Sequence, residues 1–336
     1  MAEWNIETLT DSLRDMGLAG PHDEPRYTAL TGGVSSEIWR VDLPSGAVCI
    51  KRALPKLRVE QDWFASVDRW QFEVAWFRVA RSIVSEAVPK ILGVDTERHL
   101  FAMEFLDPGS HRLWKTMLRD GHADPIFAGK VGRTVGRIHA ATAGRADVAA
   151  AFSSDAIFEA IRIEPYLRVT AGRHPDLKSR FQALAQTTLE TRLTLVHGDV
   201  SPKNILVGPS GPIFLDAECA WWGDPAFDVA FCLNHLLLKC LWTPRTASSF
   251  LACFDSFIQA YLAEVKWEPA ASLEARTAAL LPGLLLARID GKSPVEYITG
   301  ERDKNRVRQV ARALLTVPPR CFFAIRAAWS REFEFA

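Results

Sequence analysis

This chain of 336 residues lacks an excess of either positive or negative charge, because its 40 Lys and Arg residues balance its 40 Asp and Glu residues. No overall field draws it to nucleic acid or to an anionic membrane, and we expect neither as a partner. Its six cysteines lack CxxC spacing, and its N-terminal segment is charged and amphipathic, unlike a secretory signal. These features predict a reduced, cytoplasmic protein.

Long apolar runs and metal-binding motifs are missing as well. The most apolar stretch, residues 278–287, is interrupted by Pro282 and Gly283 and is too short to cross a bilayer. The eight histidines show no HExxH or similar spacing, which argues against a metal hydrolase. What is present is a 48% share of apolar residues, enough for a core in each of two lobes.

Strand-like alternation of apolar and polar residues fills the stretch from Tyr27 to Leu106. It runs through TALTGGVSSEIWRVDL, continues from Gly46 to Arg52, and returns in KILGVDT and HLFAMEFL. One helix is expected within this stretch, over residues 68–81, because apolar residues recur there at helical spacing. The pattern predicts a small antiparallel sheet with one major helix against it.

The composition changes after residue 106, where a DPGS stretch predicts a hinge. One strand-rich island, residues 194–218, lies among the helical patterns that follow, and its Pro-Ser-Gly triplet predicts a hairpin turn. The sequence therefore predicts an α+β protein with two lobes, a sheet lobe at residues 1–106 and a larger, mainly helical lobe at residues 107–336. Helices are expected at residues 126–143, 176–192, 226–241, 246–264 and 272–289.

The densest chemical signal lies in the strand-rich island. Residues 197–204 read HGDVSPKN, and an apolar strand and the hairpin lead on to LDAE at residues 215–218. A loop carboxylate, an amide five positions later and a second carboxylate returned by a hairpin are suited to orient a hydroxyl and to hold Mg²⁺. This pattern, HGDxxxxN followed by LDxE, resembles the catalytic and metal-binding segments of the aminoglycoside phosphotransferase and choline kinase family, which has a protein-kinase-like fold.

The resemblance implies transfer of the γ-phosphoryl group of ATP, or of GTP, to a hydroxyl of a small metabolite or an aminoglycoside-like compound. Asp199 would be the catalytic base, and Asn204 and Asp216 would hold Mg²⁺. Glu218 is a candidate third ligand, and Asp228 is expected to brace the catalytic loop. The alternative, a chance HGD tripeptide with Asp216 capping a strand, does not explain why order, spacing and hairpin agree.

A nucleotide kinase also needs a phosphate-covering loop, a strand lysine and an acidic partner on the next helix. Lys51 matches the lysine, and Glu73 is the best partner for it, with Asp68 as the alternative. The turn LTGGVSS is similar to the phosphate-covering turn of the family, and its candidate contacts are Gly32, Gly33, Val34, Ser35 and Ser36. An ordinary hairpin turn, a surface lysine and a solvated helix face are the structural alternatives.

The end of the last strand before the hinge resembles the segment that meets adenine in such kinases. Main-chain groups of Glu104 and Leu106 would make this contact. A plain linker between the lobes predicts the same sequence, because a main-chain contact does not depend on the side chains.

Acceptor specificity is expected in the helical lobe, since the same phosphate machinery serves many hydroxyls. KRALPKLR at residues 51–58 and the DxE motif resemble methylthioribose kinase, although this chain keeps Asn204, from which those kinases depart. The helical lobe is rich in Arg, so a neutral or anionic metabolite fits at least as well as a cationic antibiotic. The candidate substrate residues, for each of which packing or helix-end charge is the alternative, are Trp221, Trp222, Asn234, His235, Arg288 and Asp290.

Two other classes of protein are weighed against this interpretation. A catalytically weak pseudokinase or scaffold would keep the lobes and lose a chemical group, yet every group named above has a candidate. A protein kinase would need an activation segment with an APE-like anchor after Asp216, but GDPAFD and a helical pattern follow directly. A small-molecule kinase is therefore the leading hypothesis.

Overall fold

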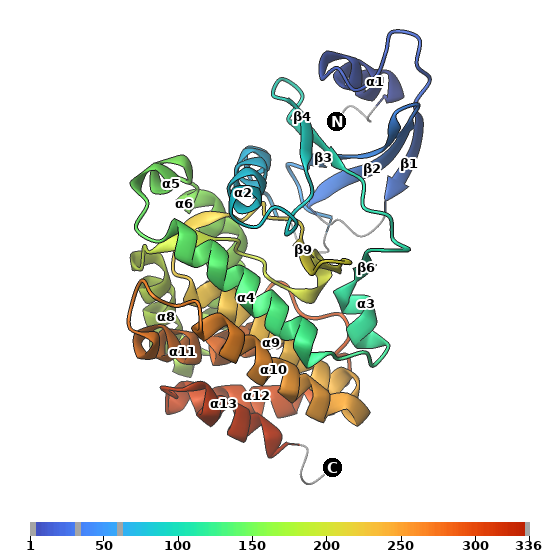
Figure 1. Cartoon of the computed structure of the whole chain (residues 1–336). Helices are drawn as coiled ribbons and strands as arrows, with labels where there is room; N and C mark the ends of the chain where they lie inside the picture. Colours follow the sequence, from blue (N-terminus) through green and yellow to red (C-terminus); the bar gives the residue numbers. More distant parts are fainter. Residues whose placement is uncertain (1–4, 31–34, 59–62, 333–336) are drawn as a thin grey trace.

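An antiparallel sheet of five strands forms the N-terminal region of the computed structural model, which describes residues 5–30, 35–58 and 63–332 (Figure 1). The spatial order of its strands is β1-β2-β3-β5-β4. In sequence they are β1 (Arg26–Leu30), β2 (Ser36–Leu43), β3 (Gly46–Ala53), β4 (Ile91–Asp95) and β5 (Leu100–Glu104). The antiparallel sheet predicted from the alternation is confirmed.

Both faces of this sheet are covered, because successive residues of a strand point to opposite sides. Helix α2 (Arg69–Ile83) packs on the face that carries Cys49 and Phe101. Helix α1 (Ile6–Asp15) packs on the other face, where Ile50 and Leu100 join its buried leucines in a separate core. The predicted helix at residues 68–81 corresponds to α2, whereas α1 was not predicted.

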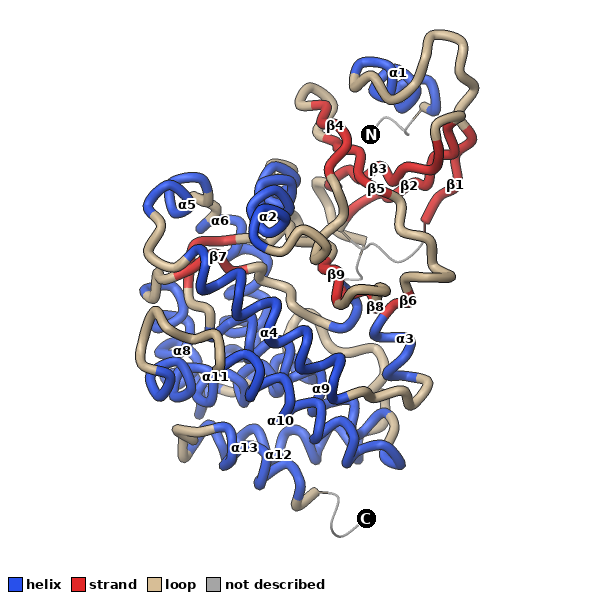
Figure 2. Tube along the Cα trace, in the orientation of Figure 1, coloured by secondary structure: helices blue, strands red, loops and turns tan. Residues whose placement is uncertain are grey.

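The remainder of the chain is mainly helical, with the helices gathered below the sheet in Figure 2. Its helices are α3 (Trp114–Arg119), α4 (Pro125–Thr142), α5 (Ala146–Ala151), α6 (Asp155–Phe158), a π-helix (Glu159–Arg168), α7 (Val169–Arg173), α8 (Lys178–Glu190), α9 (Ala226–Trp242), α10 (Ala247–Leu262), α11 (Ala270–Asp290), α12 (Glu301–Thr316) and α13 (Phe322–Ser330). Three short 3₁₀ turns span Pro175–Leu177, Pro202–Asn204 and Pro244–Thr246. The five predicted helices correspond to α4, α8, α9, α10 and α11.

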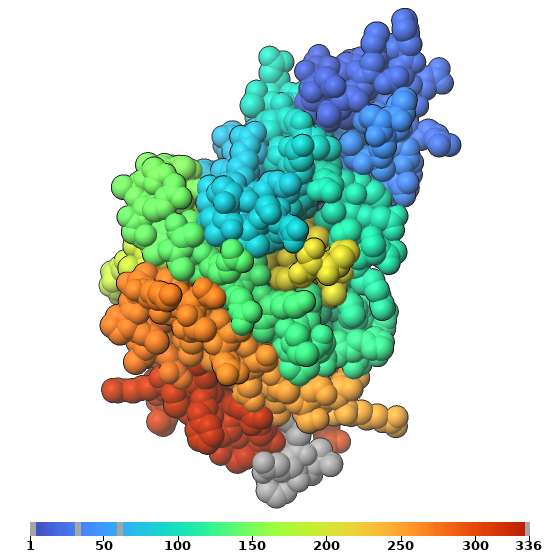
Figure 3. All heavy atoms as spheres, in the orientation of Figure 1, coloured from blue at the N-terminus to red at the C-terminus, as the bar shows by residue number. Residues whose placement is uncertain are grey.

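Two small strand groups hold the segment with the candidate catalytic residues between the sheet and the helices. Strand β7 (Thr194–Val196) pairs with β10 (Trp221–Gly223), and β6 (Arg112–Leu113) pairs with β8 (Ile205–Val207). Strand β9 (Pro212–Phe214) completes the predicted hairpin, which is closed by a hydrogen bond from Gly208 N to Gly211 O of 2.9 Å. In Figure 3 the yellow atoms of this segment lie between cyan atoms of the N-terminal region and green atoms of the helical region.

Helix α11 is long and apolar enough, by length and composition alone, to cross a membrane. It packs instead against α9 and α12, and residues 280–289 are buried in the main core. Its apolar character is therefore explained by its central position among the helices, and Pro282 lies within the helix without ending it.

Candidate active site

The predicted catalytic loop, residues 197–204, begins at a tight turn that hydrogen bonds to Asp228 of α9 hold in place. The carboxylate of Asp228 accepts hydrogen bonds from the backbone N–H groups of His197 at 2.7 Å and Gly198 at 2.8 Å. Gly198 has a φ of 79°, and an added Cβ would meet the carbonyl oxygen of Cys219 at 2.6 Å. Only glycine fits there without strain. The bracing role predicted for Asp228 is confirmed by these hydrogen bonds.

Asp199 is buried and faces two cations. Its Oδ2 lies 2.8 Å from Nη2 of Arg162 and 3.0 Å from Nζ of Lys203, and Ser201 donates to its Oδ1 at 3.2 Å. Burial alone would raise the pKa of Asp199, but the positive charges of Lys203 and Arg162 outweigh it and hold the pKa well below its usual range. Asp199 is therefore an anion at neutral pH.

Arg162 is a functional candidate that the sequence did not reveal. It lies in the π-helix, where its Nε donates to the carbonyl oxygen of Gly198 while its Nη2 meets Asp199. π-Helices are rare overall, and those that occur often lie at functional sites. One side chain thus holds both the backbone and the carboxylate of the catalytic loop.

Asn204 and Asp216 offer oxygen ligands on neighbouring segments. The side-chain amide of Asn204 donates to the backbone carbonyl of Asp199 at 3.2 Å, and the backbone carbonyl of Asn204 accepts from Leu215 N at 2.8 Å. This second bond brings Asp216 beside the loop. Asp216 has a φ of 63°, a conformation that side-chain-bearing residues rarely adopt and that clusters at functional sites.

Lys51 joins the sheet to this segment. Its Nζ lies 2.7 Å from Oε1 of Glu73 on α2 and also contacts Oδ1 of Asp216. Burial would lower the pKa of Lys51, but the charges of Asp216 and Glu73 outweigh it and raise the pKa above its usual value. The ion pair between Lys51 and Glu73 predicted from the sequence is present, and Asp68 is not needed for it.

Glu218 is held by a buried arginine rather than left free. Its Oε2 accepts a hydrogen bond of 2.8 Å from Nε of Arg69, whose Nη2 donates to the carbonyl oxygen of Ser35 at 2.5 Å. Arg69 therefore links the end of the predicted phosphate-covering loop to the segment that carries the candidate metal ligands. Ser36 is buried, and its hydroxyl has no hydrogen-bond partner among the described residues. The other loop candidates, Gly32, Gly33 and Val34, lie outside the described residues.

The predicted adenine contact lies where β5 leaves the sheet. The N–H of Glu104 donates to the carbonyl oxygen of Lys90 at 2.9 Å, and the Glu104 side chain is exposed. Leu106 follows two residues later and is half-buried. That the main-chain groups of Glu104 and Leu106 point toward a nucleotide stays a prediction.

Three of the substrate candidates have structural partners. Trp221 is fully buried, stacks on Phe158 with a centroid distance of 4.2 Å and donates to Asp155 at 2.6 Å. Trp222 is its buried neighbour on β10, where it pairs with Leu195 of β7. Asp290 binds Arg308 at 2.7 Å and His174 at 3.0 Å, and neither partner belongs to the catalytic segment.

The other three candidates, Asn234, His235 and Arg288, are buried with polar atoms unsatisfied. Both amide atoms of Asn234, Nε2 of His235 and Nε of Arg288 have no hydrogen-bond partner among the described residues. Burial, with the charges of Arg288 and Lys239, lowers the pKa of His235, while Asp199 opposes this effect. The His235 ring packs on Phe231 at a centroid distance of 5.5 Å, and the same Phe231 ring lies 5.6 Å from the guanidinium of Arg162, which binds Asp199.

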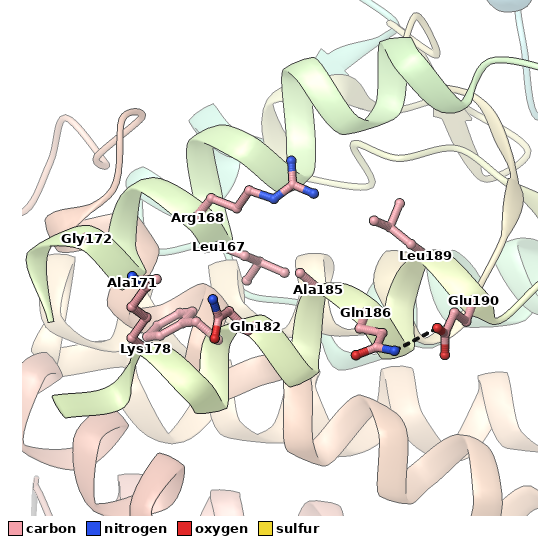
Figure 4. A pocket seen from close by; sticks show the side chains of 11 residues that line it. Leu167, Arg168, Ala171, Gly172, Lys178, Gln182, Ala185, Gln186, Leu189 and Glu190 are labelled. Carbon is pink, nitrogen blue, oxygen red and sulfur yellow. Dashed lines mark hydrogen bonds between the residues drawn. The ribbon is translucent and has the colours of Figure 1, made fainter. Parts of the chain in front are cut away.

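A surface hollow of about 850 Å³ lies elsewhere, between the π-helix with α7 and the long α8 (Figure 4). Its walls are mostly apolar, and two of its polar lining residues, Gln186 and Glu190, are joined by a hydrogen bond of 2.8 Å. None of the catalytic or metal-ligand candidates lines it.

A sheet lysine paired with a helix glutamate lies beside a loop aspartate, an asparagine and a second aspartate, which is the set of groups that phosphoryl transfer on a protein-kinase-like fold uses. The solved structure of choline kinase from Cryptosporidium parvum has this fold, with a TM-score of 0.58 at 13% identity over 93% of this chain and 97% of the other. An amicoumacin kinase bound to AMP-PNP, Ca²⁺ and Ami gives a TM-score of 0.59 at 13% identity, over 95% and 96% of the two chains.

The model of the phosphotransferase enzyme family matches residues 26–265, which is more than half of the chain. The chain belongs to this family. Methylthioribose kinase 2 of Oryza sativa subsp. japonica is 23% identical over 222 residues, which cover 58% of this chain. The match spans 52% of that relative, so this chain corresponds to about half of its length.

Proposed function

We propose that this chain transfers the γ-phosphoryl group of ATP to a hydroxyl of a small molecule, and that Asp199 orients the hydroxyl and accepts its proton. The observation that carries the proposal is the contact of Lys51, from the sheet, with Asp216, beside the Asp199 loop. This contact brings Lys51, which would hold the nucleotide, next to Asp216, which would hold the metal ion for phosphoryl transfer. GTP is the alternative donor.

The nucleotide would lie between the sheet and the catalytic loop. Lys51 is suited to hold the α and β phosphates, and the loop that ends at Ser35 and Ser36 is suited to cover them, together with Gly32, Gly33 and Val34. Glu104 and Leu106 would meet the base through main-chain groups. Arg69 supports this arrangement because it anchors the carbonyl of Ser35.

Asn204 and Asp216 would hold Mg²⁺, since amide and carboxylate oxygens suit this ion and it is often bound by only one or two protein carboxylates besides phosphates and water. No group of three His, Cys, Asp or Glu residues is arranged for a metal within the described ranges, so such a sparse set is the one available. When bound, the ion would neutralise charge on the phosphoryl group. Glu218 is assigned to holding Arg69, because that arginine already binds its carboxylate.

Asp199 would act as an anion whose orientation is fixed before the acceptor arrives. Arg162 and Lys203 keep it ionised, and Lys203, whose side chain is 43% exposed, would also attract the phosphates of the donor. A positioned base contributes roughly 10² to 10⁴ in rate, so the rest of the acceleration must come from alignment and charge neutralisation.

A screen of hydroxyl compounds for ADP release tests this proposal. Purified protein is supplied with Mg²⁺ and ATP, in parallel with GTP, and Asp199→Asn serves as the blank. We expect at least one compound class to stimulate ADP release in the unmodified protein alone. Nucleotide binding without release in any class would instead favour the pseudokinase alternative.

A further inference from the structure

A second group of buried polar side chains lies beside the catalytic loop, and the proposed function leaves it without a role. His235 and Lys239 lie one turn apart on α9, Arg288 comes from α11, and Tyr297 comes from the loop that follows α11. We call these four residues the α9–α11 cluster. Lys239 lies 4.5 Å from the Tyr297 ring centre. The rings of His235 and Tyr166 both pack on Phe231, and the Tyr166 hydroxyl accepts a hydrogen bond from Arg288 at 3.3 Å.

Arg288 is a buried guanidinium whose partners are all uncharged. Its Nη1 donates to the hydroxyl of Ser293 at 3.0 Å, to the carbonyl of the same residue and to the hydroxyl of Tyr166 at 3.3 Å. Its Nε has no partner, and no carboxylate within the described ranges forms a salt bridge with it. A buried cation without a counter-ion is costly, so this one needs an explanation.

Lys239, one turn after His235 on α9, is a second buried basic side chain that forms no salt bridge with a carboxylate among the described residues. It is 1% exposed, and its Nζ lies 4.4 Å from the ring centre of Trp242 and 4.5 Å from that of Tyr297. Burial and the charges of Lys115 and Arg288 lower its pKa to about 7. The nearby acid Glu296 is already paired with Lys115 at 2.5 Å, which leaves a positive excess in the cluster.

The cluster is continuous with the catalytic loop. The Tyr166 hydroxyl accepts a hydrogen bond from Arg288 at 3.3 Å. The Tyr166 ring centre lies 5.7 Å from the guanidinium carbon of Arg288 and 5.8 Å from that of Arg162, and Arg162 binds Asp199. A small molecule whose hydroxyl reached Asp199 would therefore extend toward Arg288.

Three polar atoms of the cluster have no hydrogen-bond partner among the described residues, namely Arg288 Nε, His235 Nε2 and the hydroxyl of Tyr297. A buried guanidinium without a salt bridge, a neighbouring amine that can take up a proton and three unsatisfied polar atoms are the surroundings that a carboxylate or a phosphate would satisfy. A cationic acceptor would instead meet like charge. We propose that the acceptor oriented by Asp199 carries an anionic group, a carboxylate or a phosphate, bound by Arg288 and Lys239; this inference rests on the proposed function.

Anion binding is measured first, without any turnover. The protein is saturated with AMP-PNP and Mg²⁺, so that the donor site is filled, and is titrated with inorganic phosphate or with acetate at constant ionic strength while Tm is recorded. We expect one of these anions to raise Tm in the unmodified protein but not in Arg288→Met or Lys239→Met. A rise in Tm with phosphate indicates that the acceptor carries a phosphate, and a rise with acetate indicates that it carries a carboxylate.

The matched control is Arg326→Met, which removes the charge of an arginine on α13 whose partner is Asp255 at 2.7 Å. It should respond to the anion as the unmodified protein does. Lys239 lies against two aromatic rings, so methionine fits its surroundings and this variant is expected to fold even if Arg288→Met does not. An equal Tm response in Lys239→Met, or no response to either anion in the unmodified protein, overturns the inference.

Matched pairs of acceptors then test specificity, a hydroxy acid against its amide and a sugar phosphate against its sugar. We expect ADP release with the anionic member, and in Lys239→Met or Arg288→Met a KM at least about tenfold higher with kcat little changed. Equal turnover of the neutral members contradicts the anionic acceptor and leaves the kinase proposal standing. No ADP release above the Asp199→Asn blank with any acceptor contradicts the kinase proposal, while anion binding is still decided by Tm.

Discussion

The guanidinium of Arg162 lies 2.8 Å from the carboxylate of Asp199, and its Nε holds the carbonyl of Gly198 in the same loop. The π-helix and the catalytic loop are therefore joined at the proposed base. This contact has a consequence for pH dependence, because Arg162 and Lys203 together hold the pKa of Asp199 below its usual range.

Replacing Arg162 by Met should move the acid limb of the kcat/KM profile to higher pH. Without this charge the pKa of Asp199 rises, so the carboxylate is protonated, and inactive as a base, at a higher pH than in the unmodified protein. Arg168→Met is the control, since Arg168 lies in the same π-helix but is half exposed and binds Glu159. An unshifted acid limb in Arg162→Met would be incompatible with the role given to this contact.

Arg69 and Glu218 should behave as a coupled pair in stability. Arg69 is fully buried, so Glu218→Ala leaves its charge without a counter-ion, at a cost of about 3–5 kcal/mol in the free energy of unfolding. The double variant Arg69→Met with Glu218→Met should cost less than the sum of the single changes to Met. Urea unfolding measures all of these variants. Additivity to within about 0.5 kcal/mol would mean that the two side chains do not interact as described.

The arrangement of the candidate catalytic residues could be predicted because these residues are close in sequence. Asp199, Asn204 and Asp216 are brought together by one hairpin, and Lys51 and Glu73 by a strand and the next helix. Arg69 and Glu218 are 149 positions apart, and no local pattern marks their contact. Such a contact depends on how the sheet docks on the helices, which periodicity does not describe.

Arg162 was missed for a related physical reason. An arginine on a helical stretch is ordinarily a solvated side chain, and the π-helical geometry that turns it toward Asp199 leaves no hydrophobic period to detect. Helix α12 is different, because Val307, Ala311 and Leu315 recur at helical spacing and are buried, so a signal for it was present in the sequence.

The low pKa of Lys239 predicts a stability difference that depends on pH. In the unfolded chain the pKa of a lysine is about 10.4, and in the folded protein burial lowers that of Lys239 to about 7. Between these values the unfolded state binds the extra proton, so the free energy of unfolding rises with pH through this window because of Lys239.

Lys239→Met removes this dependence. Relative to the unmodified protein, the variant should be most stabilised at pH 7 and below and should lose this advantage progressively toward pH 10, as followed by urea unfolding at each pH. A difference in unfolding free energy that stays constant from pH 7 to pH 10 would show that the amine is ionised throughout in the folded protein.

The central claim is that Asp199 is the base of a phosphoryl transfer and not a structural carboxylate. It is tested most directly by measuring acceptor-stimulated ADP release and AMP-PNP affinity for the unmodified protein and Asp199→Asn, at equal Mg²⁺. The account predicts that ADP release falls by roughly 10² to 10⁴ while the Kd for AMP-PNP is nearly unchanged. ADP release by Asp199→Asn at the rate of the unmodified protein would contradict it.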